Sequence, residues 1–457
     1  MARQVNKSIL FVAPSAYPFG GVADWLAYLL PGLEGLGWTC SLGLVVGKHH
    51  QVNRYLDRHP FRRVRQIVNP TGSPEGRVRA VQCAIESTSP DVVATINIVD
   101  VYEAVRRIRQ RGSSNVRLVT TLHGLQDDLL ADIACNRDII DAVISSNRLS
   151  QSLVVDSLGG GDTRSLYAPY GVALPAHLNR GPDRTDCIRL LYSGRVEQEQ
   201  KRVLDLPPLL SALRRHGQSV QLVIAGDGPD AQRLKDAFAS AGVADYVRWA
   251  GVLNRGALAQ QYRESDALII TSDWETGPIV AWEAMANRLP VVSSAYVGAG
   301  RERALIDGQN CLLFPVGDTE AAASKVMQLQ DDAIRNRLTA NAYQTVLARY
   351  TLDASVKAWA DAFGRALQVP SLPCGTALAS PALPPLSGRL DRLLGVPLGE
   401  TVRATLGVAY EHASPGAEWP HTRQSSPDAM AFLAKAARVD RQLPVDSASS
   451  DASLRPV

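Results

Sequence analysis

The sequence predicts an α/β protein with two doubly wound, Rossmann-like domains and a Pro-rich C-terminal extension. Short apolar runs alternate with longer segments of helical periodicity, the pattern of a parallel sheet covered by helices on both faces. The alternation stops at the polar stretch 179–186 and then restarts. The length of 457 residues suits two or three domains. We therefore expect an N-terminal domain at 1–180, a C-terminal domain with final helices at 181–368, and an extension at 369–457 that is partly disordered.

The first half supplies a series of candidate strands separated by helix-like segments. The first strand is followed by Gly20 and Gly21, and apolar residues then recur at helical spacing over Asp24–Leu36, up to the stop signal Gly37. The candidate strands are Ser8–Pro14, Ser41–Val46, Asp91–Ile98, Arg117–Leu122 and Ala142–Ser145. Strands joined through helices predict parallel pairing.

The second half repeats this arrangement after the polar linker. Its candidate strands are Ile188–Ser193, Val220–Ala225, Val247–Trp249, Ala267–Thr271, Pro290–Ser293 and Cys311–Phe314. Helices are expected over Thr319–Leu347 and Leu352–Leu367. Ligands of doubly wound sheets bind beyond the carboxyl ends of the strands, so we expect the two domains to face a cleft that holds the site.

The extension differs in composition from the rest of the chain. Residues 370–457 hold 11 of the 27 prolines. Pro370–Ser387 is expected to be an extended linker, and Asp446–Val457 to be disordered. Helices are expected at Arg389–Leu394 and at Ser426–Arg438, where a serine stands at the cap and a proline follows it.

Composition excludes several classes of protein. A net charge of +3 without a concentrated basic region argues against a nucleic-acid partner. No run of about 18 apolar residues is present that could span a bilayer, and the apolar run Ile9–Ala13 is too short for a signal peptide, so a cytoplasmic location is expected. The six cysteines are scattered without a C-x-x-C pair, and no metal site is expected.

The segment with the strongest chemical signal is Asp266–Ser294. A candidate strand ends near its start, a loop with Glu275 and Gly277 follows, and Pro278 opens a helix that contains Glu283. The start of a helix offers free N–H groups and a partial positive charge, which suit a diphosphate. Two carboxylates beside it can accept hydrogen bonds from hydroxyls that flank the phosphates. The alternative is an ordinary strand-to-helix turn with two surface acids.

This segment resembles the E-x7-E element of retaining GT-B glycosyltransferases, the family-four-like group also called glycosyl transferases group 1. The chain reads E-T-G-P-I-V-A-W-E-A-M-A, with a threonine where the family has a glycine after the first glutamate. The resemblance implies that Glu275 holds hydroxyls of the transferred sugar and that Glu283 holds the ribose. The residues that it places against the donor are Thr276, Gly277, Pro278, Ile279 and Glu283.

Further segments resemble the same family in the expected order. In Leu190–Leu206 a strand is followed by Arg195 and Lys201, which in the family neutralise the leaving diphosphate. The spacing is one residue longer than the commoner family version, so choosing Lys201 rather than its neighbour Arg202 is an interpretation. Two fixed cations supply what a departing diphosphate needs when no metal is present. The alternative is a solvated basic turn.

Glycines and aromatic residues complete the resemblance. Gly226 and Gly228 end a strand where the family places a loop near the donor, and Trp249 lies in the segment that contacts the base. Gly20 and Gly21 match the Gly-rich entry loop. Each pair of glycines is also compatible with a plain turn.

His123 ends a strand in the sequence T-T-L-H-G, where the family carries a histidine beside the transferred sugar. A lone histidine is more often structural. The resemblance makes His123, Arg195, Lys201 and Glu275 the expected catalytic residues.

The implied function is transfer of a hexosyl unit from a nucleotide-diphosphate sugar to an unknown acceptor hydroxyl, with retention and with neither metal nor cofactor. The acceptor would be a glycan, a lipid-linked compound or a small molecule, in polysaccharide, glycolipid or glycoconjugate biosynthesis. No D-x-D triplet occurs, which disfavours a metal-bridged enzyme. A nucleotide-sugar epimerase and a catalytically silent scaffold are the alternatives, and a dehydrogenase is disfavoured because no G-x-G-x-x-G follows the first strand.

A basic cluster lies on an expected helix of the first domain and consists of Arg106, Arg107, Arg109 and Arg111. It could meet anionic lipid headgroups or a lipid-diphosphate acceptor. This would place the protein at the inner face of the membrane through a peripheral contact. A solvated helix face is the alternative.

Overall fold

The computed structural model describes residues 7–18, 20–112, 115–160, 163–176, 186–370, 372, 388–420 and 429–442. The chain divides into two compact units. Unit 1 contains Met1–Gly181, Thr276–Leu289 and Ala340–Ala429, and unit 2 contains Pro182–Glu275, Pro290–Thr339 and Met430–Val457. The first division, at Gly181, falls next to the expected boundary. The expected linker 179–186 lies outside the described residues except for Asp186.

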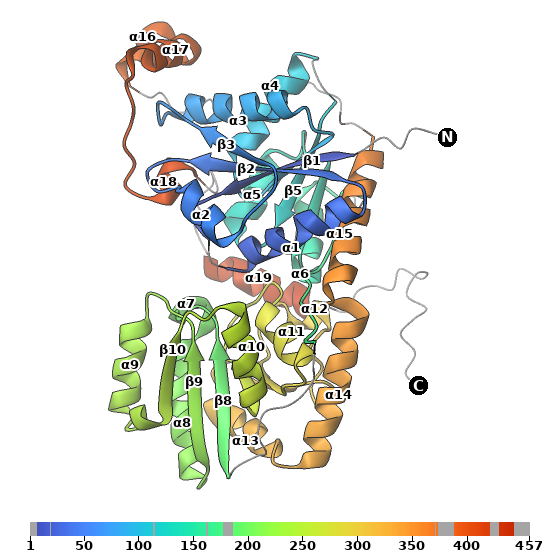
Figure 1. The fold of residues 1–457 in the computed structure, drawn as a ribbon, viewed down its shortest axis with the longest axis vertical. Helices are drawn as coiled ribbons and strands as arrows, with labels where there is room; N and C mark the ends of the chain where they lie inside the picture. Colours follow the sequence, from blue (N-terminus) through green and yellow to red (C-terminus); the bar gives the residue numbers. More distant parts are fainter. Residues whose placement is uncertain are drawn as a thin grey trace. The chain divides into compact units, whose positions relative to one another are not determined.

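Unit 1 is built on a seven-stranded parallel sheet with the order β3-β2-β1-β4-β5-β6-β7. The strands are β1 (Ser8–Pro14), β2 (Thr39–Val46), β3 (Val64–Val68), β4 (Val92–Thr95), β5 (Arg117–Leu122), β6 (Ala142–Ser145) and β7 (Ser165–Tyr167). The helices between them are α1 (Gly21–Gly35), α2 (Val52–Arg58), α3 (Pro74–Thr88), α4 (Asp100–Gln110), α5 (Asp127–Cys135) and α6 (Arg148–Ser157). Helices α3 and α4 lie on one side of the sheet and α1 on the other (Figure 1). The strand order reverses between β1 and β4, as in a doubly wound sheet.

Helix α15 (Leu352–Gln368) completes the core of unit 1, which corrects the expected assignment of the final helices to the second domain. Its fully buried Trp359 packs on Trp25 of α1, with ring centroids 4.6 Å apart. Phe363 meets Phe11 of β1 edge-on. The helix approaches α1 so closely that a Cβ on Gly32 would lie 2.5 Å from Val356. The apolar face of α15 therefore belongs to the first sheet.

Unit 2 is built on a six-stranded parallel sheet with the order β10-β9-β8-β11-β12-β13. The strands are β8 (Cys187–Ser193), β9 (Ser219–Ala225), β10 (Val247–Gly251), β11 (Ala267–Ile270), β12 (Val291–Ser294) and β13 (Leu312–Phe314). The helices that follow them are α7 (Gln198–Lys201), α8 (Leu206–Arg215), α9 (Ala231–Ser240), α10 (Arg255–Glu264), α12 (Ala299–Glu302) and α13 (Thr319–Gln328). Helix α11 (Ile279–Ala286) is grouped with unit 1. The expected helix 319–347 is interrupted after Gln328 and resumes as α14 (Asp332–Arg349).

The described part of the extension is helical and docks on the rest of the chain, and helices were expected at two places in it. It contains α16 (Arg389–Leu394), α17 (Val396–Leu406), α18 (Pro415–Glu418) and α19 (Ala429–Arg441). The bounds of α16 agree with the expected helix, and α19 overlaps the second one. The expected disordered end Asp446–Val457 lies outside the described residues, as does the expected linker apart from Pro370 and Leu372.

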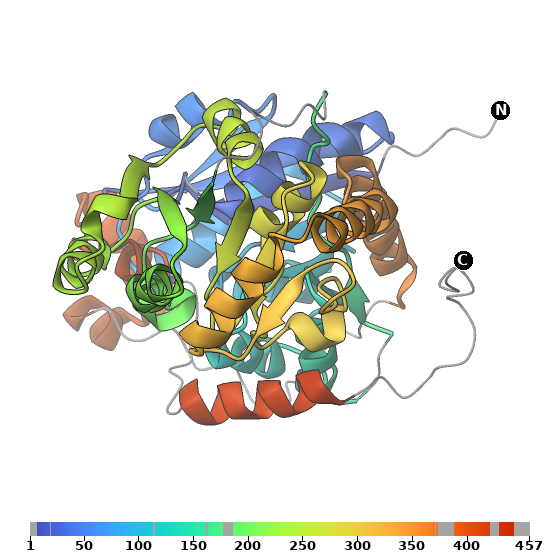
Figure 2. The same ribbon diagram turned by 90° about the horizontal axis from the view of Figure 1, so that it is seen from below.

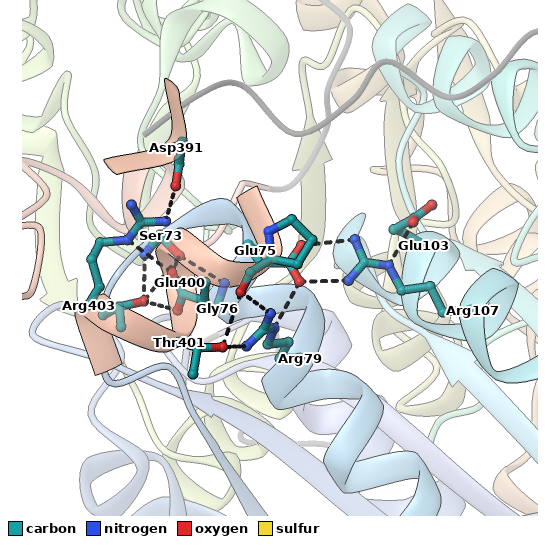
Figure 3. A network of polar contacts seen from close by, with 12 residues as sticks. Ser73, Glu75, Gly76, Arg79, Glu103, Arg107, Asp391, Glu400, Thr401 and Arg403 are labelled. Carbon is teal, nitrogen blue, oxygen red and sulfur yellow. Dashed lines mark hydrogen bonds and ion pairs between the residues drawn. The ribbon is translucent and has the colours of Figure 1, made fainter. Parts of the chain in front are cut away.

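A buried polar network fastens α16 and α17 to α3 in unit 1 (Figure 3). Glu400 is 2% exposed and accepts hydrogen bonds from Thr71 Oγ1 (2.6 Å) and Ser73 Oγ (2.5 Å), the cap of α3. Arg403 pairs with Asp391 of α16 at 2.7 Å and with Glu400 at 3.1 Å. The hairpin of α16 and α17 is therefore fixed by charge and hydrogen bonding rather than by apolar packing.

A second carboxylate anchors α18 to the loop after β2. Glu418 accepts hydrogen bonds from the main-chain N–H groups of Lys48 (2.6 Å) and His49 (2.9 Å), and pairs with His50 Nδ1 at 2.9 Å. A Cβ on Gly47 would lie 2.2 Å from this carboxylate, so only glycine leaves it room. The extension therefore reaches the carboxyl end of β2.

Replacing Arg403 by alanine is expected to release the hairpin of α16 and α17. Removing one partner of a buried ion pair costs about 3–5 kcal/mol, because the remaining charges stay buried without compensation. Limited trypsin digestion should therefore cut faster at the exposed Arg389 and Arg392. Arg54→Ala, on the surface of α2, is the control. Equal cleavage rates in the two variants would show that the network does not hold the hairpin.

Candidate functional site

Unit 2 carries an ion pair at the carboxyl ends of its central strands. Lys201 at the end of α7 places Nζ 2.6 Å from Glu275 Oε1, in the loop that follows β11. Ser272 Oγ donates a second hydrogen bond to Glu275 Oε1 at 2.5 Å. The Glu275 side chain is only 7% exposed, whereas that of Lys201 is 22% exposed. The pair thus combines a fixed carboxylate with a cation that solvent can reach.

Arg195 lies on the same side of the sheet, directly after β8. Its guanidinium donates to Glu197 Oε2 (3.0 Å) and Gln200 Oε1 (3.1 Å), and its side chain is 58% exposed. Gln200 in turn donates to the carbonyl of Trp274 at 3.0 Å. Gln200 therefore links the loop of Arg195 with the loop of Glu275.

The structure distinguishes Lys201 from its neighbour Arg202. The Arg202 guanidinium pairs with Asp205 at 2.8 Å, within its own segment. It also lies beside Gly317, where a Cβ would be 2.9 Å from Arg202 Nη2. Lys201 alone of the two contacts Glu275, and its expected role at the diphosphate stays a prediction.

Gly226 and Gly228 pack the loop after β9 against the loop after β8. A Cβ on Gly226 would lie 1.9 Å from the carbonyl oxygen of Gly194, and one on Gly228 would lie 2.2 Å from that of Val196. Gly226 also has φ +150°. These glycines thus place the backbone that carries Arg195, which is a structural reason for them apart from any contact with a donor.

Trp249 is directed toward α9 rather than beyond the end of β10. Its ring meets Phe238 edge-on at 6.3 Å, and the ammonium group of Lys235 lies 5.2 Å from its centre. Val252, directly after the strand, is 60% exposed. The expected contact of Trp249 with a nucleotide base stays a prediction.

His123 lies at the end of β5 in an aromatic cluster of unit 1. Its Nδ1 is 2.6 Å from the hydroxyl of Tyr170, and its Nε2 is 3.0 Å from Thr121 Oγ1. Rings of Trp25 and Trp359 lie at 4.5 and 6.0 Å. Burial lowers the pKa of the imidazole to about 3, so it is neutral near pH 7. Both ring nitrogens are already hydrogen-bonded, an arrangement that does not support the expected contact with a sugar.

The start of the E-x7-E helix contributes a second set of residues in unit 1. Thr276 Oγ1 donates to the carbonyl of His123 at 2.9 Å. Gly277 has φ +110°, and a Cβ there would lie 3.4 Å from the ring of Tyr170. The side chain of Ile279 lies against Gly21, where a Cβ would be 3.0 Å from Ile279 Cδ1.

The remaining expected residues frame this set. Gly20 is the exposed cap of α1, with φ +129°. Pro278 is the cap of α11, and Glu283 lies half-buried on that helix. Sequence reasoning missed Ser272, Gln200 and Tyr170. For Ser272 the sequence offered one local signal, its position at a strand end three residues before Glu275. For the other two it offered none.

The basic cluster on α4 is paired within the fold. Arg106 pairs with Asp138, Arg107 with Glu75 at 2.8 Å, and Arg109 with Asp141. Arg111 is the most exposed of the four, with 62% of its side chain accessible. The cluster therefore does not present a free basic face. The structure gives no support to the expected membrane contact, which was inferred from this cluster.

Neither a metal site nor a membrane span is found in the described part of the chain. Over the described ranges, no group of three or more His, Cys, Asp or Glu side chains is arranged to hold a metal ion. None of the helices in those ranges combines the length and apolarity needed to cross a membrane.

Comparison with known proteins gives the family of the second half. The model of the family described as glycosyl transferases group 1 matches residues 179–345. The chain carries a glycosyl transferases group 1 domain. Two parallel sheets, each with alternating helices, match the GT-B fold of its structural neighbours. The group 1 domain contains four of the site residues that were predicted from the sequence, namely Arg195, Lys201, Glu275 and Glu283.

The relatives of the group 1 domain are transferases. Alpha-D-kanosaminyltransferase from Streptomyces kanamyceticus is 30% identical over 167 residues, which are 36% of this chain and 42% of the relative. The chain thus spans less than half of that protein. The structure of the lipopolysaccharide outer core galactosyltransferase WaaB in its apo form matches with a TM-score of 0.62 at 18% identity, covering 78% of this chain and 99% of WaaB.

A further solved structure is that of Anabaena Alr3699/HepE in complex with UDP and glucose. It matches with a TM-score of 0.64 at 18% identity and covers 79% of this chain and 100% of HepE. At such identities the likeness establishes the fold alone. Neither structure covers the whole chain, and the family match ends before the extension.

Proposed function

We propose that this protein is a retaining glycosyltransferase that moves a hexosyl unit from a nucleotide-diphosphate sugar to an acceptor hydroxyl. It works without a metal ion, in polysaccharide, glycolipid or glycoconjugate biosynthesis and in the cytoplasm. The observation that carries the proposal is the contact of Lys201 with Glu275, with Arg195 on the neighbouring loop. A fixed carboxylate beside two accessible cations suits a sugar diphosphate, whose sugar is rich in hydroxyls and whose diphosphate is negative.

The side chains of unit 2 suggest how the donor is handled. In the free protein Lys201 is shared with Glu275, and an arriving diphosphate competes for its charge. When Lys201 turns to the diphosphate, Glu275 Oε1 keeps its bond from Ser272 and loses the one from Lys201, so the carboxylate can accept a sugar hydroxyl in its place. Arg195 is exposed enough to reach the diphosphate as well.

The transfer then proceeds on one face of the sugar. The bond between the anomeric carbon and the diphosphate oxygen breaks, and the electron pair leaves with the diphosphate. The acceptor oxygen forms the new bond on the same face, and its proton passes to the departing phosphate oxygen. Arg195 and Lys201 stabilise the charge that develops on the leaving group. The donor contacts of Glu283 and of Thr276, Gly277, Pro278 and Ile279 remain predictions.

Activity is expected to persist in excess EDTA, because side-chain cations take the place of a metal. UDP-glucose is the first donor to try, since HepE is described with UDP and glucose. UDP-galactose, UDP-N-acetylglucosamine and GDP-mannose follow. Binding is screened by thermal shift, because a ligand that binds only the folded state raises the melting temperature.

The stereochemistry of the product supplies the second measurement. Proton NMR of the first product formed should show the anomeric configuration of the donor. Inversion would contradict the retaining mechanism. Loss of activity in EDTA with recovery on adding Mg²⁺ or Mn²⁺ would contradict the proposed leaving-group chemistry.

A further inference from the structure

The last described helix of the extension, α19, places one carboxylate in unit 2. Asp440 is 9% exposed. Its Oδ2 accepts hydrogen bonds from the main-chain N–H groups of Gly298 (2.8 Å) and Gly300 (3.1 Å), and its Oδ1 accepts one from that of Arg301 (2.8 Å). The Arg301 side chain also donates to the carbonyl of Val439 at 2.7 Å. In Figures 1 and 2, α19 lies beside α12.

The fit between α19 and this loop is close. A Cβ on Gly300 would lie 2.7 Å from the carbonyl oxygen of Asp440. Gly298 has φ +113°, in the left-handed region that glycine adopts most readily. Three main-chain donors thus meet one ionised acceptor, and such charge-assisted hydrogen bonds are stronger than neutral ones.

The loop held by Asp440 also holds the peptide of Glu275. The N–H of Glu275 donates to the carbonyl of Val297 at 3.1 Å, and the N–H of Val297 donates to the carbonyl of Asp273 at 2.9 Å. A Cβ on Gly298 would lie only 2.3 Å from the carbonyl oxygen of Glu275. The two segments therefore pack backbone to backbone, and a shift of one requires a shift of the other.

The strands beneath this loop make the same connection. Ser294, at the end of β12, donates through Oγ to the carbonyl of Ser272 at 2.5 Å. Ser272 is the residue whose hydroxyl donates to the Glu275 carboxylate. The loop after β12 thus supports Glu275 both through its peptide and through the residue that orients its side chain.

We propose that Asp440 is a positioning residue for Glu275. It fixes the loop from Val297 to Arg301, and this loop in turn fixes the carboxylate that faces the sugar. The catalytic meaning of this inference rests on the proposed function. Asp440 lies outside residues 179–345, which match the family model, so the extension adds this support to the group 1 domain.

Amide hydrogen exchange of the full-length protein tests the physical step without any donor. Asp440→Asn keeps the size of the side chain and removes its charge. We expect amide exchange in the variant to be about tenfold faster than in the wild type at Gly298, Gly300 and Arg301, because a charge-assisted hydrogen bond is lost. The same increase is expected at Glu275 and Val297. Asp245→Asn, an exposed carboxylate of unit 2, is the matched control and should change none of them. Faster exchange confined to Gly298–Arg301, with Glu275 unchanged, would overturn the proposal.

Turnover of UDP-glucose tests the catalytic step. Asp440→Asn should lower kcat about tenfold with little change in KM, and Asp440→Glu, which restores the charge, should recover part of the loss. In a Glu275→Gln background, Asp440→Asn should have no further effect, because residues that act through one another are not additive. Multiplicative losses in the double variant would overturn the proposal. Unchanged turnover of Glu275→Gln itself would contradict the proposed function instead, and hydrogen exchange would still decide whether Asp440 supports the Glu275 peptide.

Discussion

Replacing Lys201 by glutamine is expected to lower kcat for a nucleotide-diphosphate sugar about 100- to 1,000-fold. This is the usual effect of removing one group that stabilises charge in a transition state. Glutamine is of similar length and can still donate to Glu275, but it carries no charge for the leaving diphosphate. The folded structure should persist, because Lys201 is not part of the apolar core. Steady-state kinetics with the donor found by thermal shift gives the ratio of kcat values.

Arg202→Gln is the matched control, since it removes a cation from the next residue in the chain. Arg202 pairs with Asp205 rather than with Glu275, so its loss should change kcat less than about threefold. A larger loss for Arg202→Gln than for Lys201→Gln would reverse the assignment. Equal, small losses would remove the main support for a cation-assisted departure.

Replacing His123 by alanine is expected to lower the free energy of unfolding by about 3 kcal/mol, because it opens a cavity and removes one hydrogen-bond partner of the buried hydroxyl of Tyr170. For a unit of this size that corresponds to a fall in melting temperature of roughly 6–12 °C. Thermal unfolding followed by circular dichroism measures it. His216→Ala, on the surface, is the control and should stay within about 2 °C of the wild type.

The effect of His123→Ala should also depend on pH. The folded-state pKa of His123 is lowered by burial from 6.5 to about 3, so the unfolded chain binds a proton more readily. The wild-type histidine therefore contributes its full stability above pH 6.5 and loses part of it as the pH falls toward 3. The difference between wild type and variant should narrow over this range. A difference that widened on acidification would contradict the buried, neutral state of His123.

The strands whose bounds the sequence patterns located best have continuous buried runs. Ser8–Pro14, Arg117–Leu122 and Ala142–Ser145 have the bounds expected of them, because their apolar residues face helices on both sides of the sheet. The two edge strands of the first sheet gave no such signal. Val64–Val68 exposes Arg65 and Gln66, and β7 has only three residues, so neither has an uninterrupted apolar run.

The sequence predicted site residues well where a motif contains charged side chains. It predicted them less well for histidine and tryptophan, which serve in packing as often as in ligand binding. The family resemblance alone assigned Lys201 and Glu275 to one site, and in the structure the two side chains are in contact. For His123 the sequence gave the strand end but not the partners Thr121 and Tyr170. For Trp249 a strand position did not reveal which way the ring turns.

The fold of the extension shows a different limit. Several of its large apolar residues are exposed, and its docking depends on Glu400, Glu418 and Asp440 meeting groups far away in the sequence. No periodicity connects a carboxylate with a main-chain N–H some 140 or 370 residues away. For the same reason the return of α15 to the first sheet was missed, since an amphipathic helix does not specify which core it joins.

The anchors of the extension have a consequence for how freely this protein can change its sequence. Glu418 and Asp440 bond mostly to main-chain N–H groups, which every residue except proline supplies. Exchanging the side chain of Lys48 or His49 therefore keeps the main-chain hydrogen bonds to Glu418, and loses only the contacts of these side chains with Glu411 and His412. The restrictive positions are instead Gly47 and Gly300, where one added carbon would collide with the docked chain. Substitutions at most positions of these two loops should leave the extension docked, whereas substitutions of Gly47 or Gly300 should displace it.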